Sequence, residues 1–328
     1  MSEVNDLAVN KNKKLSLGKK IFNSGLRIII GGGLLVYVII KVNPKEIFYA
    51  VASANLFFIL IALFLLVPNI LIQFLKWKLT CRIFLNEDNN RKIIVSLFHG
   101  LSGGTFTPVR IGEYFGRAIE FKEHSFIKIS LATFIDKLFP LLVLGFFGSL
   151  FSILFFIIYY RLTLSVSLAL ALLVMVIYYL IFLYLLNKKF RESALLKNFE
   201  TKIKPDSVWA NLKMLKIIDG KFSVMMVSFS IIFYLCVLVQ FTFLISAFTH
   251  NFNFLNYMWA GNLVMFAKSL VPSISFADLG VRESASVYFL TKMGESSAAA
   301  FNASLFLFFI NVLLPSIIGV VFLFKRSR

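Results

Sequence analysis

The sequence predicts an all-α polytopic membrane protein with about six full transmembrane helices and two interrupted or re-entrant helices. Of the 328 residues, 59% are apolar, and the mean hydropathy is +0.84. Only 15% are charged, whereas a soluble domain has about 25%. Several stretches reach the roughly 20 apolar residues that a membrane-spanning helix needs. This composition excludes a soluble globular enzyme, a disordered chain and a secreted disulfide scaffold.

Five long apolar stretches predict full spans. They are Phe57–Leu75, Leu138–Ile158, Leu162–Leu186, Phe222–Phe248 and Phe301–Phe324. A sixth stretch, Ile28–Ile40, is shorter and spans only if the flanking Arg27 and Lys41 snorkel or if the helix begins near Ile21. A signal peptide is the alternative for this stretch, but the small residues at Ala52–Ala54 lie too far downstream for normal cleavage. We interpret Ile28–Ile40 as an uncleaved first helix.

Two further apolar stretches, Ile93–Phe106 and Tyr257–Val271, are too short to be simple spans. Each contains or is followed by glycine and proline, which stop helices. The residues expected to break the helices are Gly103, Gly104, Pro108, Gly112, Pro272 and Gly280. Both stretches are therefore predicted to be re-entrant or interrupted helices.

The formal net charge of +18 would point to nucleic acid in a soluble protein, but here its distribution predicts orientation. Four segments hold 23 of the 34 basic residues: the N-terminal arm through Arg27, the loops Lys76–Lys92 and Lys188–Lys221, and the tail after Phe324. The intervening loops, Val42–Asn55, Tyr159–Arg161 and Thr249–Asn256, hold only Lys45 and Arg161. The positive-inside rule places both termini in the cytoplasm of a plasma or inner membrane, and no nucleic-acid partner is needed.

The predicted domain organisation is a basic cytoplasmic arm, residues 1–20, followed by one transmembrane domain, residues 21–328. Its halves would be 21–160 and 161–324, each ordered span, span, interrupted helix, span, and running in opposite directions. Inverted repeats that meet at broken helices are typical of transporters. The alternative is that any six-span protein with two short apolar pieces can be divided in this way.

Two charged clusters adjoin the interrupted helices. The first contains Arg110, Glu113 and Arg117, and the second contains Asp278, Arg282 and Glu283. An ionisable residue at membrane depth costs about 2.5–3.5 kcal/mol, so such clusters indicate a cavity or mutual pairing. Arg110 and Arg282 would bind a lipid phosphate, while the glutamates would orient the arginines or face a cationic headgroup. The alternative for Arg110 and Glu113 is an i,i+3 ion pair on a helix surface at the water interface.

Other polar residues lie close to predicted spans. Asp136 and Lys137 either line the same cavity or mark the interface, with Pro140 opening the buried helix, and Lys268 would pair with Asp278 or Glu283. Five amides are expected to form interhelical hydrogen bonds: Gln73, Gln240, Asn262, Asn302 and Asn311. The histidines and cysteines match no metal-ligand spacing, so neither a metal nor a cofactor is expected.

The motifs resemble one known family. Pro108-Val109-Arg110-Ile111-Gly112-Glu113 with Arg117 resembles the P-x-R-x-G-E-x-x-R signature of the lysylphosphatidylglycerol synthase transmembrane, or flippase-like, family. The segment from Asp278 to Glu283 resembles its second motif, G-L-G-V-R-E, and Asp136-Lys137 is similar to its acidic-basic pair. Asp278 stands where the family has glycine, and the spacing from proline is one residue longer. The resemblance implies the translocating part of such proteins without the soluble synthase domain.

The leading hypothesis is a lipid translocator that moves a phospholipid or a polyprenyl-phosphate-linked lipid between leaflets. Its partners would be membrane lipids with an anionic headgroup or lipid phosphate, together with a separate lipid-synthesis enzyme. Two alternatives are a membrane enzyme of lipid glycosyl or aminoacyl transfer and an accessory subunit. The enzyme is disfavoured because the sequence contains no phosphate-binding loop, metal-carboxylate motif or nucleophile–base constellation.

Overall fold

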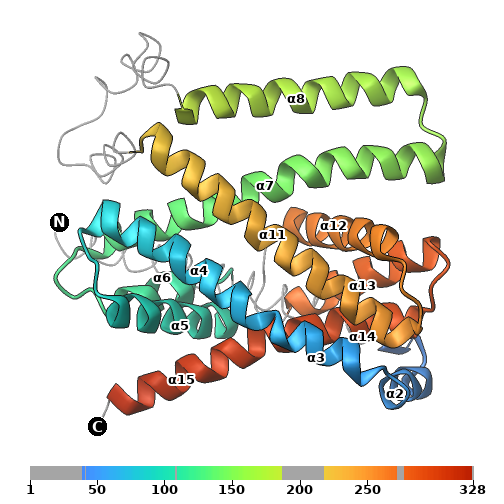
Figure 1. Cartoon of the computed structure of the whole chain (residues 1–328), viewed down its shortest axis with the longest axis horizontal. Helices are drawn as coiled ribbons and strands as arrows, with labels where there is room; N and C mark the ends of the chain where they lie inside the picture. The colour runs from blue at the N-terminus through green and yellow to red at the C-terminus, as the bar shows by residue number, and fades with distance from the viewer. Residues whose placement is uncertain (1–38, 41, 108, 187–217, 272–276, 327–328) are drawn as a thin grey trace, which may run out of the picture.

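The computed structural model describes residues 39–40, 42–107, 109–186, 218–271 and 277–326. Within these residues the regular secondary structure is helical (Figure 1), which confirms the all-α prediction. The arm 1–20, most of Ile28–Ile40, and the prolines Pro108 and Pro272 lie outside the described residues, so the first span stays a prediction.

Five helical segments are long and apolar enough to cross a membrane. They are Leu56–Leu85, Phe126–Tyr160, Leu164–Leu186, Gly220–Thr249 and Ser297–Phe324. The first comprises α3 (Leu56–Phe64), α4 (Leu66–Thr80) and the π-helical η1 (Cys81–Leu85). The next three are single helices: α7 (Phe126–Tyr160), α8 (Leu164–Leu186) and α11 (Gly220–Thr249). The last comprises α14 (Ser297–Phe308), η3 (Phe309–Leu313) and most of α15 (Leu314–Arg326). Each contains one of the five predicted long stretches almost entirely.

Two predicted span boundaries and one predicted loop are wrong. The helix after Phe57 continues to Leu85, so Lys76 lies inside a span and not in a loop. Helix α7 begins at Phe126, where the Ser125 side chain caps it, and Pro140 therefore lies within the helix and does not open it. A charged residue beside an apolar run predicts the end of a span, but a charge that finds a buried partner need not lie at the interface. The predicted loop Val42–Asn55 also contains a helix, α2 (Pro44–Ala52).

The two interrupted segments fold into helical hairpins. In the first, α5 (Asn90–Phe106) packs against α6 (Ile111–Ala118); in the second, α12 (Phe254–Leu270) packs against α13 (Ala277–Lys292). Figure 1 shows α5 and α6 toward the left end of the spans and α12 and α13 toward the right end. The chain leaves helical structure after Phe106 and after Leu270, as the two predicted interruptions require.

The predicted role of four glycines as helix breakers is wrong. Gly103 and Gly104 lie inside α5, Gly112 lies in α6, and Gly280 lies in α13. In the first hairpin they instead allow close contact: a Cβ on Gly103 would overlap the carbonyl oxygen of Gly112. Small residues spaced four apart let membrane helices approach in this way.

Helix α11 (Gly220–Thr249) runs diagonally through the fold and contacts α3, α4, α7, α12 and α14 (Figure 1). Helix α5 packs against α15, and α12 packs against α7. Four of the five expected amides make hydrogen bonds between separate segments. The side chains of Gln240, Asn262 and Asn302 donate to the backbone carbonyls of Ala62, Phe147 and Ile47, respectively, and Asn311 donates to the side-chain oxygen of Gln240. Gln73 is the exception, because it donates to Asn69 within α4.

Candidate functional site

The turn of the first hairpin presents Arg110. Val109 and Arg110 both have left-handed backbone angles, with φ of 57° and 55°, a conformation that costs a non-glycine residue about 1–2 kcal/mol. The Thr107 hydroxyl holds this turn, since it donates to the Gly103 carbonyl and accepts from the Gly112 N–H, each over 2.7 Å. Strain of this kind persists only where the surroundings enforce it, and it is often found at functional sites.

Glu113, which is 3% exposed, lies among three cations. Its Oε1 atom lies 2.6 Å from Lys137 Nζ and 2.9 Å from Arg117 Nη2. Its Oε2 atom lies 3.6 Å from Arg110 Nε. The Arg110–Glu113 pair is therefore not a surface ion pair, because its carboxylate is buried.

Asp136 extends this network to α4. Its Oδ2 atom accepts from Arg117 Nη1 over 3.0 Å, and its Oδ1 atom lies 3.6 Å from Lys76 Nζ. The Arg117 guanidinium also lies over the ring of Trp77, 4.2 Å from the ring centroid, a favourable cation–π geometry. Asp136 is itself buried, with 3% of the residue exposed.

The second cluster is smaller and equally buried. Arg282 Nη2 donates to Glu283 Oε1 over 2.8 Å, and Arg282 Nε donates to the Ser304 hydroxyl over 2.9 Å. The Ser304 hydroxyl in turn donates to Glu283 Oε1 over 3.0 Å. The side chain of Asp278 lies outside the described residues, so its predicted pairing stays untested.

One polar cavity of about 310 Å³ brings the two clusters together. Among the residues that the structure describes, five cations and one carboxylate line it: Lys76, Arg110, Lys137, Lys268, Arg282 and Asp136. Glu113, Arg117 and Glu283 are not among its lining residues; they pair with residues that are. The cations of the wall therefore come from both hairpins and from α4 and α7, with an excess of positive charge.

Sequence reasoning missed several residues of this cavity. The sequence predicts Lys76 in a loop and gives no role to Asn69 or Tyr234, although all three line the cavity. Asn69, Gln73 and Lys76 follow each other at i, i+4 and i+7, which places them on one face of a helix. That polar stripe in an apolar segment was the available signal. Asn311 was expected only to hydrogen bond, and it also lines the cavity from the π-helical η3.

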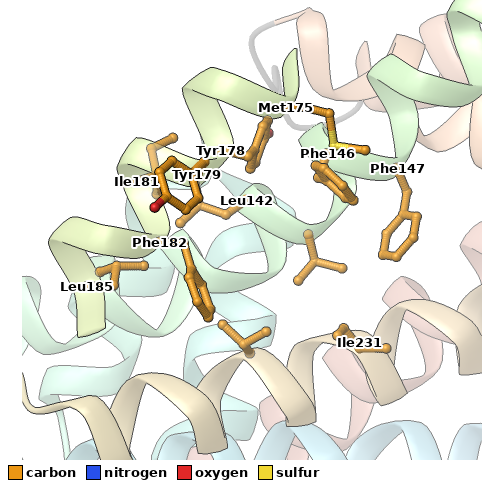
Figure 2. Close-up of a pocket in the computed structure, with 12 residues that line it drawn as sticks. Leu142, Phe146, Phe147, Met175, Tyr178, Tyr179, Ile181, Phe182, Leu185 and Ile231 are labelled. Carbon is orange, nitrogen blue, oxygen red and sulfur yellow. The ribbon is translucent and has the colours of Figure 1, made fainter. Parts of the chain in front are cut away.

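A second cavity, of about 390 Å³, lies between α7, α8 and α11. Figure 2 shows its wall, in which Phe146 and Phe147 come from α7, Tyr178 and Phe182 from α8, and Ile231 from α11. The described residues that line it include no charged side chain, so this part of its wall is apolar. Among the described residues, no group of three His, Cys, Asp or Glu side chains could hold a metal ion.

The fold and the cavity define a multi-pass membrane protein whose two helical hairpins contribute to one cationic cavity. The family model for the lysylphosphatidylglycerol synthase TM region matches residues 25–319, and the chain belongs to this family. No curated protein sequence matches the chain. Membership indicates a membrane protein of lipid metabolism or transport, and the matched region is not the soluble catalytic domain.

Proposed function

We propose that the protein is a lipid translocator that binds the phosphate of a phospholipid, or of a polyprenyl-phosphate-linked lipid, in the polar cavity. The observation that carries this proposal is the lining of that cavity, to which the described part of the chain contributes five cations and one carboxylate. A lipid phosphate satisfies such an excess of positive charge, and guanidinium groups can bind it through paired hydrogen bonds.

In this proposal the site residues have different tasks. Arg110, Lys137, Lys268 and Arg282 face the phosphate, since they line the cavity. Glu113, Arg117 and Glu283 act as positioning residues because they pair with cavity-lining side chains and do not line the cavity themselves. Asp136 holds Lys76 and Arg117 in place.

Transport would proceed by exposing the cavity to each leaflet in turn. The hairpins lie toward opposite ends of the spans (Figure 1), and their packing is reciprocal, with α5 against α15 and α12 against α7. Both features support an inverted repeat of the halves 21–160 and 161–324, the arrangement that underlies alternating access in many transporters. The basic residues support a plasma or inner membrane location with cytoplasmic termini.

The proposal is tested with purified protein in liposomes that carry a lipid with a fluorescent headgroup. Exchange between leaflets is measured by quenching from outside the liposome, with protein-free liposomes as the control. A lipid translocator accelerates this exchange in proportion to the amount of protein. Unchanged exchange, together with turnover of a lipid acceptor by an activated glycosyl or aminoacyl donor, would favour the enzyme alternative.

A further inference from the structure

Helix α2 (Pro44–Ala52) presents apolar side chains that the described part of the chain leaves uncovered. Phe48 is 71% exposed and Val51 is 40% exposed. The helix has nine residues, whereas a membrane-spanning helix needs about 20. These side chains are therefore not explained as the lipid-facing side of a span. Large apolar groups that are exposed together indicate an interaction surface.

Helix α2 lies at the level where three spans begin or end. Span α3 begins at Leu56, shortly after α2 ends. The Asn55 N–H, directly before α3, donates to the carbonyl of Ala247 in the last turn of α11 over 2.8 Å. Helix α2 also packs against α14, which starts at Ser297. Figure 1 shows α2 nearly end-on at one end of the bundle, whereas the spans run across the view. It therefore runs crosswise to the spans at the level of their ends.

One face of α2 packs on the protein. Ile47 and Ala50, which are three residues apart and so share a face, pack against Ala298 and Phe301 of α14. The carbonyl of Ile47 accepts from the Asn302 side chain over 3.0 Å. These contacts hold α2 against the first turns of α14 and fix which way its other faces point.

The rest of the helix surface is exposed and has an apolar and a polar face. The apolar face has the spacing i, i+4 and i+7 and consists of Pro44, Phe48 and Val51. The polar face consists of Lys45, Glu46 and Tyr49. A helix of this kind lies in the plane of the membrane surface, with its apolar face among the lipids and its charges in water. The crosswise direction of α2 agrees with that arrangement.

A second copy of the chain is a weaker candidate for the partner of this face. A stable interface buries about 800 Å² on each partner, whereas a large aromatic side chain buries only about 150–250 Å². Phe48 with two smaller apolar residues supplies a fraction of the required area. A lipid surface needs no such minimum, because it surrounds the spans next to α2.

We infer that α2 is an interfacial helix that binds the lipid surface, with Phe48 and Val51 inserted among the lipids and Lys45 and Glu46 in water. Because α2 is hydrogen bonded to α14, this binding holds the start of α14 at the membrane surface. The inference does not depend on whether the protein moves lipids.

The test is site-directed spin labelling of the full chain in phosphatidylcholine liposomes. The two native cysteines, Cys81 and Cys236, are replaced by alanine, and single labels are attached in the variants Lys45→Cys, Glu46→Cys, Phe48→Cys and Val51→Cys. Collisions of each label with oxygen, which concentrates in lipid, are compared with collisions with a nickel chelate, which stays in water. We expect the oxygen-to-nickel ratio to be several-fold higher at positions 48 and 51 than at positions 45 and 46. Equal ratios at all four positions would overturn the inference.

Two reference labels calibrate the ratios. Leu172→Cys reports lipid, since Leu172 is 67% exposed on span α8, and Asp88→Cys reports water, since Asp88 is exposed between η1 and α5. A ratio at position 48 that matches the Asp88 label would show that α2 projects into water, and the inference would be wrong. Spin–spin broadening at position 48 that disappears on dilution with unlabelled protein would show that a second copy covers the face, which also overturns it.

Discussion

Replacement of Glu113 by Gln is the most informative perturbation of the charged network. Gln keeps the shape of the side chain and removes the negative charge that lies 2.6 Å from Lys137 and 2.9 Å from Arg117. Breaking a buried ion pair by removing one partner costs about 3–5 kcal/mol, because the other charge stays buried without compensation. Here two close cations lose their partner and Asp136 remains for only one of them. We therefore expect a loss of about 3–5 kcal/mol in the free energy of unfolding.

The assay is equilibrium unfolding of purified protein in micelles, followed by far-ultraviolet circular dichroism. Glu87→Gln is the control, since Glu87, in the turn before α5, pairs with the partly exposed Lys92 outside the buried network, and ion pairs that water can screen contribute little. Adding Lys137→Met to the Glu113→Gln variant should recover part of the loss, because the two residues are coupled. If Glu113→Gln were no more destabilising than Glu87→Gln, the network would not be the buried structure that we describe.

Three further predictions concern the hairpin, the loops and the topology. Gly103→Ala should destabilise the protein by about 1–3 kcal/mol, because the added methyl group overpacks against the facing backbone. Gly220→Ala is the control, since the added Cβ would lie an ordinary 3.4 Å from its nearest neighbour. Equal melting temperatures of the two variants would contradict this prediction. A hydrogen bond from Lys92 lowers the pKa of Glu123 below its ordinary value of 4.5. The ion pair therefore stabilises the folded protein at pH 7, and the stability difference between wild type and Glu123→Gln should disappear as the pH falls below 4.5 and through the lowered pKa. Cysteines at Glu123 and Asn251 should react with impermeant reagents from opposite sides of the membrane, and labelling from the same side would break the inverted topology.

The sequence was sufficient for the membrane class because composition and apolar run length depend on no tertiary contact. The two interruptions were also predictable, since no long apolar run continues past Phe106 or Leu270. The motif arginines could be named but not paired. That Arg117 lies against Trp77 and Asp136, which are far from it in sequence, follows only from how α6 packs.

The errors share one physical cause. A lysine at the end of an apolar run usually marks water, yet Lys76 is buried because Asp136 lies across from it. A glycine in a short apolar helix usually weakens the helix, yet Gly103 lies inside α5 and allows its backbone to pack closely against Gly112. In both cases a partner distant in sequence decides the outcome, and spacing within one segment cannot reveal that partner. A tyrosine in a span is most often a packing residue, and only the fold places Tyr234 on the cavity wall.

The most direct test of the central claim is the rate of headgroup exchange in liposomes for variants that remove one cavity cation from each hairpin. Arg110→Gln and Arg282→Gln are compared with wild type and with Lys92→Gln, which removes a partly exposed cation from the first turn of α5, outside the cavity lining. Equal incorporation and monodisperse elution in detergent establish that the variants fold. We predict that both arginine variants slow exchange of an anionic lipid at least about 10-fold, as loss of one charged hydrogen bond of about 1.5–3 kcal/mol requires, while Lys92→Gln matches wild type. Wild-type rates for both arginine variants would contradict the claim that the two hairpins form one lipid-phosphate site.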